Sequence, residues 1–155
     1  MSKIKIFLLS LLVIFIAIQF FQPEKNQSNQ TSPNDIFAHY QAPDTMKALI
    51  TSACYDCHSN NTSYPWYANV QPLAWWLNDH IGEGKEELNF SEFATYEPKK
   101  ADHKLEEVIE MVEAEEMPLK SYTLIHGDAR LSTAQRKGLT DWAAEVRRKI
   151  QPPIK

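Results

Sequence analysis

The stretch SACYDCHSNN, residues 52–61, holds both cysteines of the chain and decides what kind of fold can surround them. Cys54 and Cys57 are separated by two residues, and His58 follows directly. This spacing fits three kinds of site: a reducible disulfide, half of a zinc site, or a covalent haem attachment in which both sulfurs bond the porphyrin and the histidine binds its iron. The rest of the sequence has to distinguish between them.

The residues that precede the motif predict a helix over residues 43–58 with both cysteines on its apolar side. Its apolar positions recur at the spacing that is typical of a helix: Met46, Leu49, Ile50, Ala53, Cys54 and Cys57. Similar spacing occurs at residues 72–84, 100–116 and 132–150. No stretch shows sustained alternation of apolar and polar residues, so the sequence predicts an all-α domain.

Local signals predict where these helices begin and end. Gly82 and Gly84 are expected to end the second helix. Pro118 disfavours helical geometry at the residue before it and is expected to stop the third helix. The stretch from Ser132 to Gln135 has the pattern of a capping box and is expected to begin the fourth.

The composition is that of one packed domain of 155 residues. Hydrophobic residues make up 43% of the chain, and it contains four Trp, six Tyr and seven Phe, which argues for a core rather than disorder. The formal net charge is −4. Because no basic excess is available to replace phosphate counterions, we expect no nucleic acid among the partners.

Residues 1–22 form a separate apolar segment. Lys3 and Lys5 precede an uncharged run that ends in Gln-Phe-Phe-Gln-Pro rather than in the small residues of a cleavage site. We therefore expect an uncleaved signal anchor that crosses the cytoplasmic (inner) membrane once as a transmembrane helix, with the domain facing the periplasm. Residues 23–35 are expected to be a flexible linker, and residues 36–151 the domain that carries the CYDCH motif.

The three possible sites at the cysteines are not equally supported. A thiol oxidoreductase normally has its C-x-x-C at the start of a helix in a βαβ context, whereas this pair ends a predicted helix. A structural zinc site usually needs a second C-x-x-C pair, which the chain lacks. Haem attachment needs no cysteine beyond this pair. Because residues three apart on a helical turn face the same side, Cys54 and Cys57 can both reach one porphyrin. The sequence therefore favours one covalent c-type haem on Cys54 and Cys57, with His58 as a ligand of its iron.

The sixth ligand of the iron is sought among the methionines and the remaining histidines. The candidates are Met46, Met111, Met117, His39, His80, His103 and His126. Met117 is preferred, because Pro118 ends the helix before it and lets the sulfur project from a loop toward a flat cofactor. The other methionines of this set fall on apolar helix faces, where core packing is the simpler explanation. His80 or His126 as the ligand, and an open sixth position, stay as alternatives.

Several stretches beyond the motif carry a family resemblance. They are CYDCHSNNTSYPWYANVQPLAWWL, GKEELNFSEF, EEMPLKSYTLIHGDARLS and GLTDWAAEV, and the likeness covers roughly residues 36–148. In these stretches the chain resembles the membrane-anchored, single-haem haem-binding domain common in Bacteroidetes and related bacteria, within the cytochrome c grouping. The resemblance implies a cytochrome c-like helical domain around one c-type haem on the CYDCH motif, and a Met-Pro loop at Met117 and Pro118.

The expected function is single-electron transfer between Fe(III) and Fe(II), by an electron carrier rather than an enzyme. The alternative is a haem peroxidase or a small-ligand sensor with an open or displaceable sixth iron position. Glu115 and Glu116 lie beside Met117, so we expect redox protein partners with a basic surface. One cluster of aromatic residues is expected either to wall the porphyrin or to form a core patch: Tyr64, Trp66, Tyr67, Trp75 and Trp76.

Overall fold

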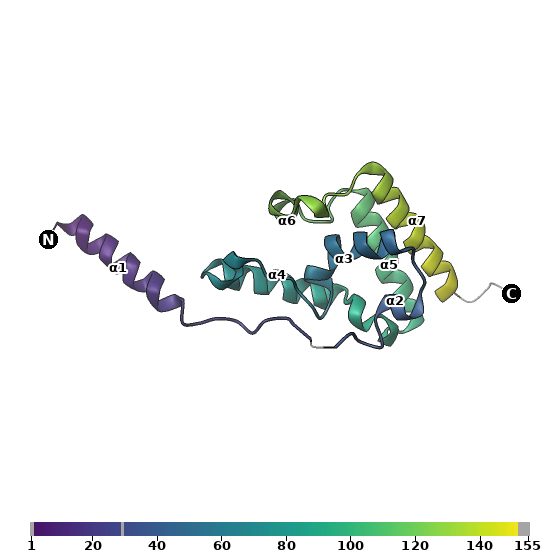
Figure 1. Ribbon diagram of the computed structural model, residues 1–155, viewed down its shortest axis with the longest axis horizontal. Coiled ribbons are helices and arrows are strands. Elements are labelled where there is room, and N and C mark those ends of the chain that lie inside the picture. Colours follow the sequence, from purple (N-terminus) through teal and green to yellow (C-terminus); the bar gives the residue numbers. More distant parts are fainter. Residues whose placement is uncertain (1, 29, 152–155) are drawn as a thin grey trace.

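The computed structural model describes residues 2–28 and 30–151, and in that part of the chain every named element is a helix. The β structure there is limited to an isolated bridge between Gln27 and Asn61. The predicted all-α class is therefore confirmed. The elements, most of them labelled in Figure 1, are α1 Lys3–Ile18, α2 Ile36–His39, α3 Asp44–His58, η1 Trp66–Asn69, α4 Leu73–Glu87, η2 Phe90–Thr95, α5 Pro98–Glu113, α6 Lys120–Ile125, η3 Gly127–Ala129 and α7 Thr133–Ile150.

The core lies where α3, α5 and α7 meet. α5 packs along α7, and α3 contacts both α4 and α7 (Figure 1). Several side chains at the centre of the core have 1% or less of their surface exposed: Ile50, Leu105, Leu139, Ala143 and Val146. Burying one of the larger of these contributes about 1.5–3 kcal/mol to stability. This packing gives α3, which carries the CYDCH motif, a rigid support.

The start of α7 agrees with its sequence signal, whereas the end of α4 does not. α7 begins with the predicted capping box, in which Ser132 Oγ accepts a hydrogen bond from the Gln135 amide at 3.3 Å and the Ser132 amide donates to Gln135 Oε1 at 2.8 Å. The expectation that Gly82 and Gly84 end their helix is wrong, because α4 continues to Glu87. A glycine weakens a helix by only about 1 kcal/mol, and the packing of α4 on α3 outweighs that cost.

The expected transmembrane helix in residues 1–22 is wrong, and so is the single-pass inner-membrane location with a domain facing the periplasm. Among the described residues no helix is both long and apolar enough to cross a membrane. α1 has 16 residues, which corresponds to about 24 Å at a rise of ~1.5 Å per residue, against a hydrocarbon core of about 30 Å. The apolar run continues past Ile18, but the helix ends there and the following residues bond to the domain. Met1 lies outside the described residues.

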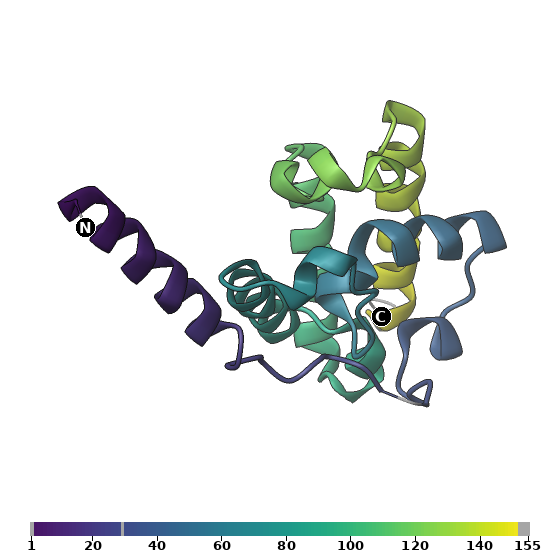
Figure 2. The same cartoon turned by 60° about the vertical axis from the view of Figure 1, so that its left-hand side comes forward.

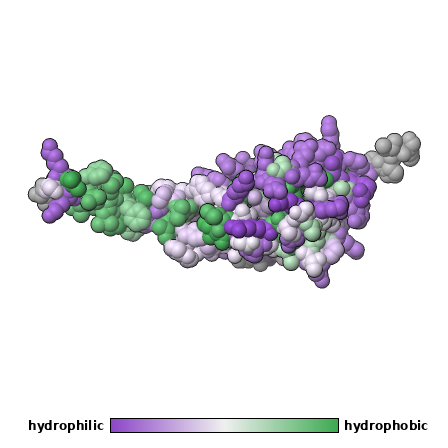
Figure 3. Space-filling view, turned by 90° about the horizontal axis from the view of Figure 1, so that it is seen from above, coloured by the Kyte–Doolittle hydropathy of each residue, from purple (hydrophilic) through white to green (hydrophobic). Residues whose placement is uncertain are grey.

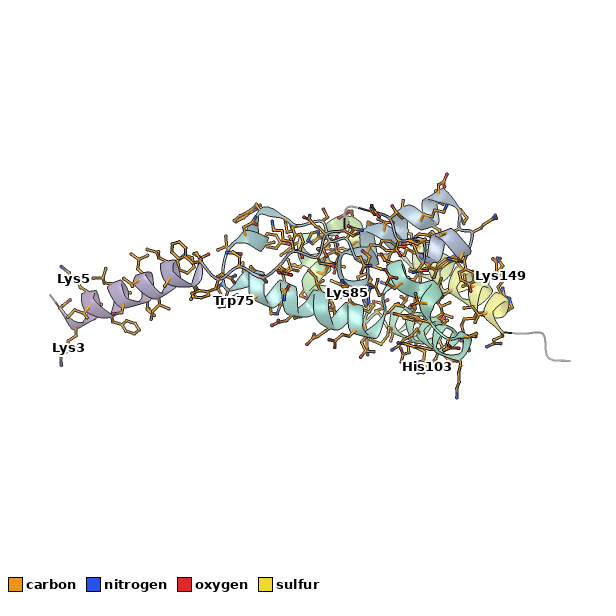
Figure 4. The ribbon with its side chains drawn as sticks, turned by 90° about the horizontal axis from the view of Figure 1, so that it is seen from below. Lys3, Lys5, Trp75, Lys85, His103 and Lys149 are labelled. Atoms are coloured by element: carbon orange, nitrogen blue, oxygen red, sulfur yellow. The ribbon has the colours of Figure 1, made fainter. Side chains whose placement is uncertain are left out.

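Gln71, whose side chain is fully buried, holds the residues that follow α1. Its backbone N–H donates to Gln19 Oε1 at 2.9 Å, and its side-chain Nε2 donates to Phe21 O at 2.8 Å. Trp75 Nε1 also donates to Phe21 O, at 2.9 Å, and Figure 4 shows Trp75 where the chain from α1 reaches the domain. α1 itself projects from the domain in Figures 1 and 2, and apolar colouring covers it in Figure 3.

Asn26, within the segment expected to be a linker, also bonds to the domain. Its backbone N–H donates to the Tyr64 hydroxyl and its side-chain Nδ2 donates to Ser59 O, both at 2.8 Å. Lys85 Nζ donates to Asn26 Oδ1 at 2.6 Å. The division into a linker at 23–35 and a domain at 36–151 stays a prediction, and Asn29 lies outside the described residues.

Candidate functional site

The CYDCH motif forms the last turn of α3, with its two cysteines half-buried and not joined to each other. The next residue, Ser59, is fully buried and extended, and its hydroxyl donates to Tyr55 O at 2.7 Å. His58 is therefore the final residue of the helix. As the sequence predicts, the motif lies at the carboxyl end of a helix, and no strand is next to it in the part of the chain described.

The orientation of His58 is set from outside its own helix. Its Nδ1 lies 3.0 Å from the carbonyl oxygen of Leu88, the residue that follows α4. Since a carbonyl can only accept a hydrogen bond, Nδ1 carries the proton and Nε2 keeps its lone pair. The ring also meets the Phe90 ring edge-on, with centroids 6.4 Å apart. Burial lowers the pKa of His58, so the imidazole is neutral at pH 7 and can bind a metal through Nε2.

α4 passes very close to the motif at Gly84. A Cβ added to Gly84 would lie 2.8 Å from the carbonyl oxygen of Cys57 and 3.1 Å from its Cβ. Any side chain here would push against backbone atoms of α3, which cannot yield without moving the helix. Gly84 thus permits the close approach of α4 that brings Leu88 to His58.

Two cavities, of about 420 and 370 Å³, adjoin the motif. Both are lined by the same six residues: Ala53, Cys54, His58, Glu87, Met117 and Pro118. Cys57 and Tyr122 line the second cavity only. Such volumes are typical of sites for small molecules and cofactors. The structure therefore places the four residues predicted from the sequence on the walls of these two neighbouring cavities: Cys54, Cys57, His58 and Met117.

The end of α5 places Met117 at these cavities. Glu115 takes the left-handed conformation, with φ 59°. The amides of Glu115 and Glu116 donate back to Val112 O and Met111 O, at 3.3 and 2.9 Å, which is the Schellman pattern of a helix end. The Met117 amide also donates to Met111 O, at 3.1 Å. α5 thus ends earlier than predicted, and the chain leaves it immediately before the predicted ligand.

Both thiols of the motif are held in the protonated form. Burial raises the pKa of Cys54 to about 12, and burial together with the neighbouring Asp56 carboxylate raises that of Cys57 to about 11. A thiol oxidoreductase needs a thiolate near neutral pH, so this environment disfavours that activity. Among residues 2–28 and 30–151, no group of three or more His, Cys, Asp or Glu side chains is placed to hold a metal ion.

The other candidates for an iron ligand are placed less favourably than Met117. His80 lines the second cavity, but its Nδ1 lies 3.0 Å from Trp76 O and its ring packs on the Trp76 ring. Met111 lines the first cavity only. His126 lines neither cavity, and its Nε2 lies 3.0 Å from the Tyr67 hydroxyl. Three further candidates also line neither: Met46, His39 and His103.

The sequence from the middle of α1 into α7 matches a known family. A family model described as a haem-binding domain matches residues 13–145, which include the motif, α4 and the Met117 segment. The chain belongs to the haem-binding domain family. Searches of the curated proteins and of the solved structures find no match to the chain. The predicted haem cofactor is confirmed by the family of this haem-binding domain, whereas covalent attachment and a single haem stay predictions.

The residues at the two cavities of this haem-binding domain fit a haem. The iron of haem takes imidazole and thioether ligands, and His58 and Met117 supply one of each. The thiols of Cys54 and Cys57 are of the kind that attaches c-type haem. Apolar side chains complete the lining of the first cavity, as a flat, largely apolar cofactor requires: Leu88, Phe90, Val108, Val112 and Leu131.

The expected aromatic cluster does not join this site. None of its five residues lines either cavity, and Trp66 has 80% of its surface exposed. Phe90 and Tyr122 line the cavities instead. The sequence cluster is therefore not the porphyrin wall.

The contributions of α4 and α5 to the cavity walls were not predicted from the sequence. Lys104 lines the first cavity with 14% of its side chain exposed, and its Nζ donates to Glu87 and Glu107 at 2.9 and 2.8 Å. A glycine inside a helical pattern is a signal that could have indicated the close approach at Gly84. No signal could have indicated Leu88, because it acts through a carbonyl that every residue has.

Proposed function

We propose that this domain holds one c-type haem covalently through Cys54 and Cys57, with His58 and Met117 as iron ligands, and transfers single electrons. The observation that supports this proposal is the shared lining of the two cavities by Cys54, His58 and Met117. If His58 and Met117 both bound the iron, no iron position would be left for a substrate, which would suit a carrier better than a peroxidase or a ligand sensor.

Each of these side chains has a distinct role in the proposal. His58 offers a neutral imidazole whose direction is set by the Leu88 carbonyl. Met117 offers a thioether sulfur, which favours the reduced state and raises the reduction potential. The apolar side chains of the first cavity would contact the porphyrin and reduce its exposure to water. When bound, haem supplies an iron that cycles between Fe(III) and Fe(II).

The acidic lining of the cavities supports a redox partner with a basic surface. Five carboxylates lie there, from Asp56, Glu83, Glu87, Glu107 and Glu110. Lys104 lies among them but is bonded to two of them. A negative potential of this kind raises the association rate of a positively charged partner, and salt weakens the effect.

A pyridine haemochrome assay and a ferric absorption spectrum test the proposal, on the full chain produced with haem-attachment machinery. We expect haem that stays attached after denaturation, a mass increase of one haem, and a low-spin spectrum with the methionine-to-iron charge-transfer band. The Cys54→Ala, Cys57→Ala double variant should lose the covalent haem. A colourless protein of apoprotein mass would reject covalent attachment. A high-spin ferric spectrum would reject Met117 as a ligand and favour the enzyme or sensor.

A further inference from the structure

Tyr122 joins the segment that carries Met117 to the helix that carries the cysteines. The chain runs from Met117 through Pro118 and Leu119 into α6, where Tyr122 lies. The Tyr122 hydroxyl donates to Asp56 Oδ2 at 2.7 Å. Asp56 is the third residue of the CYDCH motif, so this hydrogen bond links the two sides of the site directly.

Asp56 is itself held in place by other bonds. Its Oδ1 accepts a hydrogen bond from the Ser63 amide at 2.8 Å, and its carbonyl oxygen accepts one from Thr62 Oγ1 at 2.6 Å. The carboxylate therefore cannot turn away without breaking a second bond. It gives the Tyr122 hydroxyl a fixed acceptor.

The ring of Tyr122 is fixed as well. It stacks on the His126 ring, with centroids 4.3 Å apart and planes 12° apart, and His126 Nε2 lies 3.0 Å from the Tyr67 hydroxyl. No side chain of α6 is fully buried, and Tyr122 is the residue of α6 that packs against the hydrophobic core. Tyr122 also lines the second cavity together with Met117. The contacts of Tyr122, apolar and polar, are thus a main attachment of this segment.

We propose that the hydrogen bond from Tyr122 to Asp56 keeps Met117 at the cavity and limits how often foreign ligands replace it. Tyr122 is then a positioning residue, which acts on the site through the short chain segment between it and Met117. The proposal rests on Met117 being the iron ligand, as proposed above. We call this hydrogen bond, which joins the segment from Met117 to Tyr122 to the CYDCH motif, the lock.

Imidazole binding to the haem-loaded ferric full chain tests the lock, because imidazole competes with the methionine sulfur. Tyr122→Phe removes the hydroxyl and keeps the stacked ring. A hydrogen bond to a charged group is worth about 1.5–3 kcal/mol, so we expect imidazole to bind at least about tenfold more tightly. Tyr96→Phe is the matched control: its hydroxyl accepts from the Asn89 amide at 2.9 Å, it lines neither cavity, and we expect no change.

Variants of Asp56 separate the lock from a general loss of stability. Asp56→Ala should tighten imidazole binding in the same direction as Tyr122→Phe but by less, because the Tyr122 hydroxyl also lies 3.2 Å from the acceptor Ser52 O. The double variant should add little to Tyr122→Phe alone. Asp56→Asn keeps an acceptor oxygen and should restore most of the native affinity. Additive effects of the two substitutions would show that they act separately and would overturn the proposal.

Amide exchange gives a readout that does not depend on iron ligation. The Thr123 and His126 amides bond to Leu119 O and Tyr122 O within α6, both at 3.0 Å. We expect both to exchange about tenfold faster in Tyr122→Phe, since α6 opens more often. A native chain without the charge-transfer band would reject Met117 as the ligand, while the exchange rates would still decide whether the lock exists. Unchanged exchange and unchanged imidazole affinity in Tyr122→Phe would overturn it.

Discussion

His58 Nδ1 donates to the carbonyl oxygen of Leu88 across 3.0 Å, and by this bond the residue after α4 directs the ring at the end of α3. The bond selects the tautomer whose Nε2 is free, which is the form that binds iron. It can form only if α4 lies close to α3, and that closeness depends on a residue without a side chain at position 84. The surroundings of His58 are therefore assembled from two helices, although the CYDCH motif lies on one.

Gly84→Ala should weaken both the fold and the haem site. The new Cβ would meet Cys57 O at 2.8 Å, and such overpacking costs about 1–3 kcal/mol. We expect the free energy of unfolding in urea to fall by that amount, with a lower yield of covalent haem. Gly82→Ala is the control, because a Cβ added at Gly82 would meet no neighbouring segment within 4 Å; there helix propensity should raise stability by about 0.5–1 kcal/mol. Equal stability of the two variants would refute the close-packing argument.

Met117→Ala should remove the charge-transfer band of the ferric protein and lower its reduction potential, because a thioether ligand favours Fe(II). Covalent attachment should persist, since the cysteines and His58 are untouched. Met46→Leu serves as the control for loss of a thioether, because Met46 lines neither cavity. Spectra and redox titrations check both variants. A native spectrum in Met117→Ala would rule this residue out as the ligand.

Arg147→Met should destabilise the contact between α5 and α7 in a pH-dependent way. Arg147 donates to Asp102 at 2.8 Å, and this bond lowers the pKa of Asp102 below its ordinary value of 3.8. A group with a lowered pKa stabilises the fold above its unfolded pKa and loses this contribution as the pH falls through its folded pKa. Urea unfolding should show a loss of about 1 kcal/mol at pH 7 that shrinks below pH ~3.8. The exposed ion pair Lys137–Asp141 is the control: Lys137→Met should lower the free energy of unfolding by less than about 0.5 kcal/mol.

Glu115→Gly should stabilise the protein. Glu115 has a left-handed backbone conformation, which is unfavourable in free energy for any residue with a Cβ but not for glycine. We expect a gain of about 0.5–1 kcal/mol in the free energy of unfolding. Glu115 also pairs with Arg136 at 3.1 Å on the surface, so Glu115→Gln measures that pair alone. If glycine gave no gain over glutamine, the helix end would not carry the expected strain.

Neutralising the acidic lining should slow reduction by cations. In the Glu83→Gln, Glu110→Gln double variant, a cationic ruthenium ammine should react more slowly and ferricyanide faster than with the native chain, and salt should reduce both changes. Both glutamates are exposed at the cavities. Asp141→Asn, which lines neither cavity, is the control. Rates that do not respond to the double substitution would contradict the proposal of a basic partner.

The sequence by itself determined the features that depend on residues close together in the chain. The amphipathic spacing up to Cys57 predicts the helix and the position of the motif at its end, and the capping box at Ser132 predicts the start of α7. The all-α class and the haem cofactor follow from the same local patterns, and both are confirmed.

The tertiary structure alone decided the features that depend on contacts between distant segments. A hydropathy run cannot show that the chain leaves α1 at Gln19 to bond with Gln71, and the predicted membrane helix was wrong, because no helix among the described residues is long and apolar enough to cross a membrane. Nor can it show that the end of α4 supplies the carbonyl for His58, or that Tyr122 reaches Asp56. Backbone carbonyls and glycine contacts leave no periodic signal, because what they do depends on which segment packs against them.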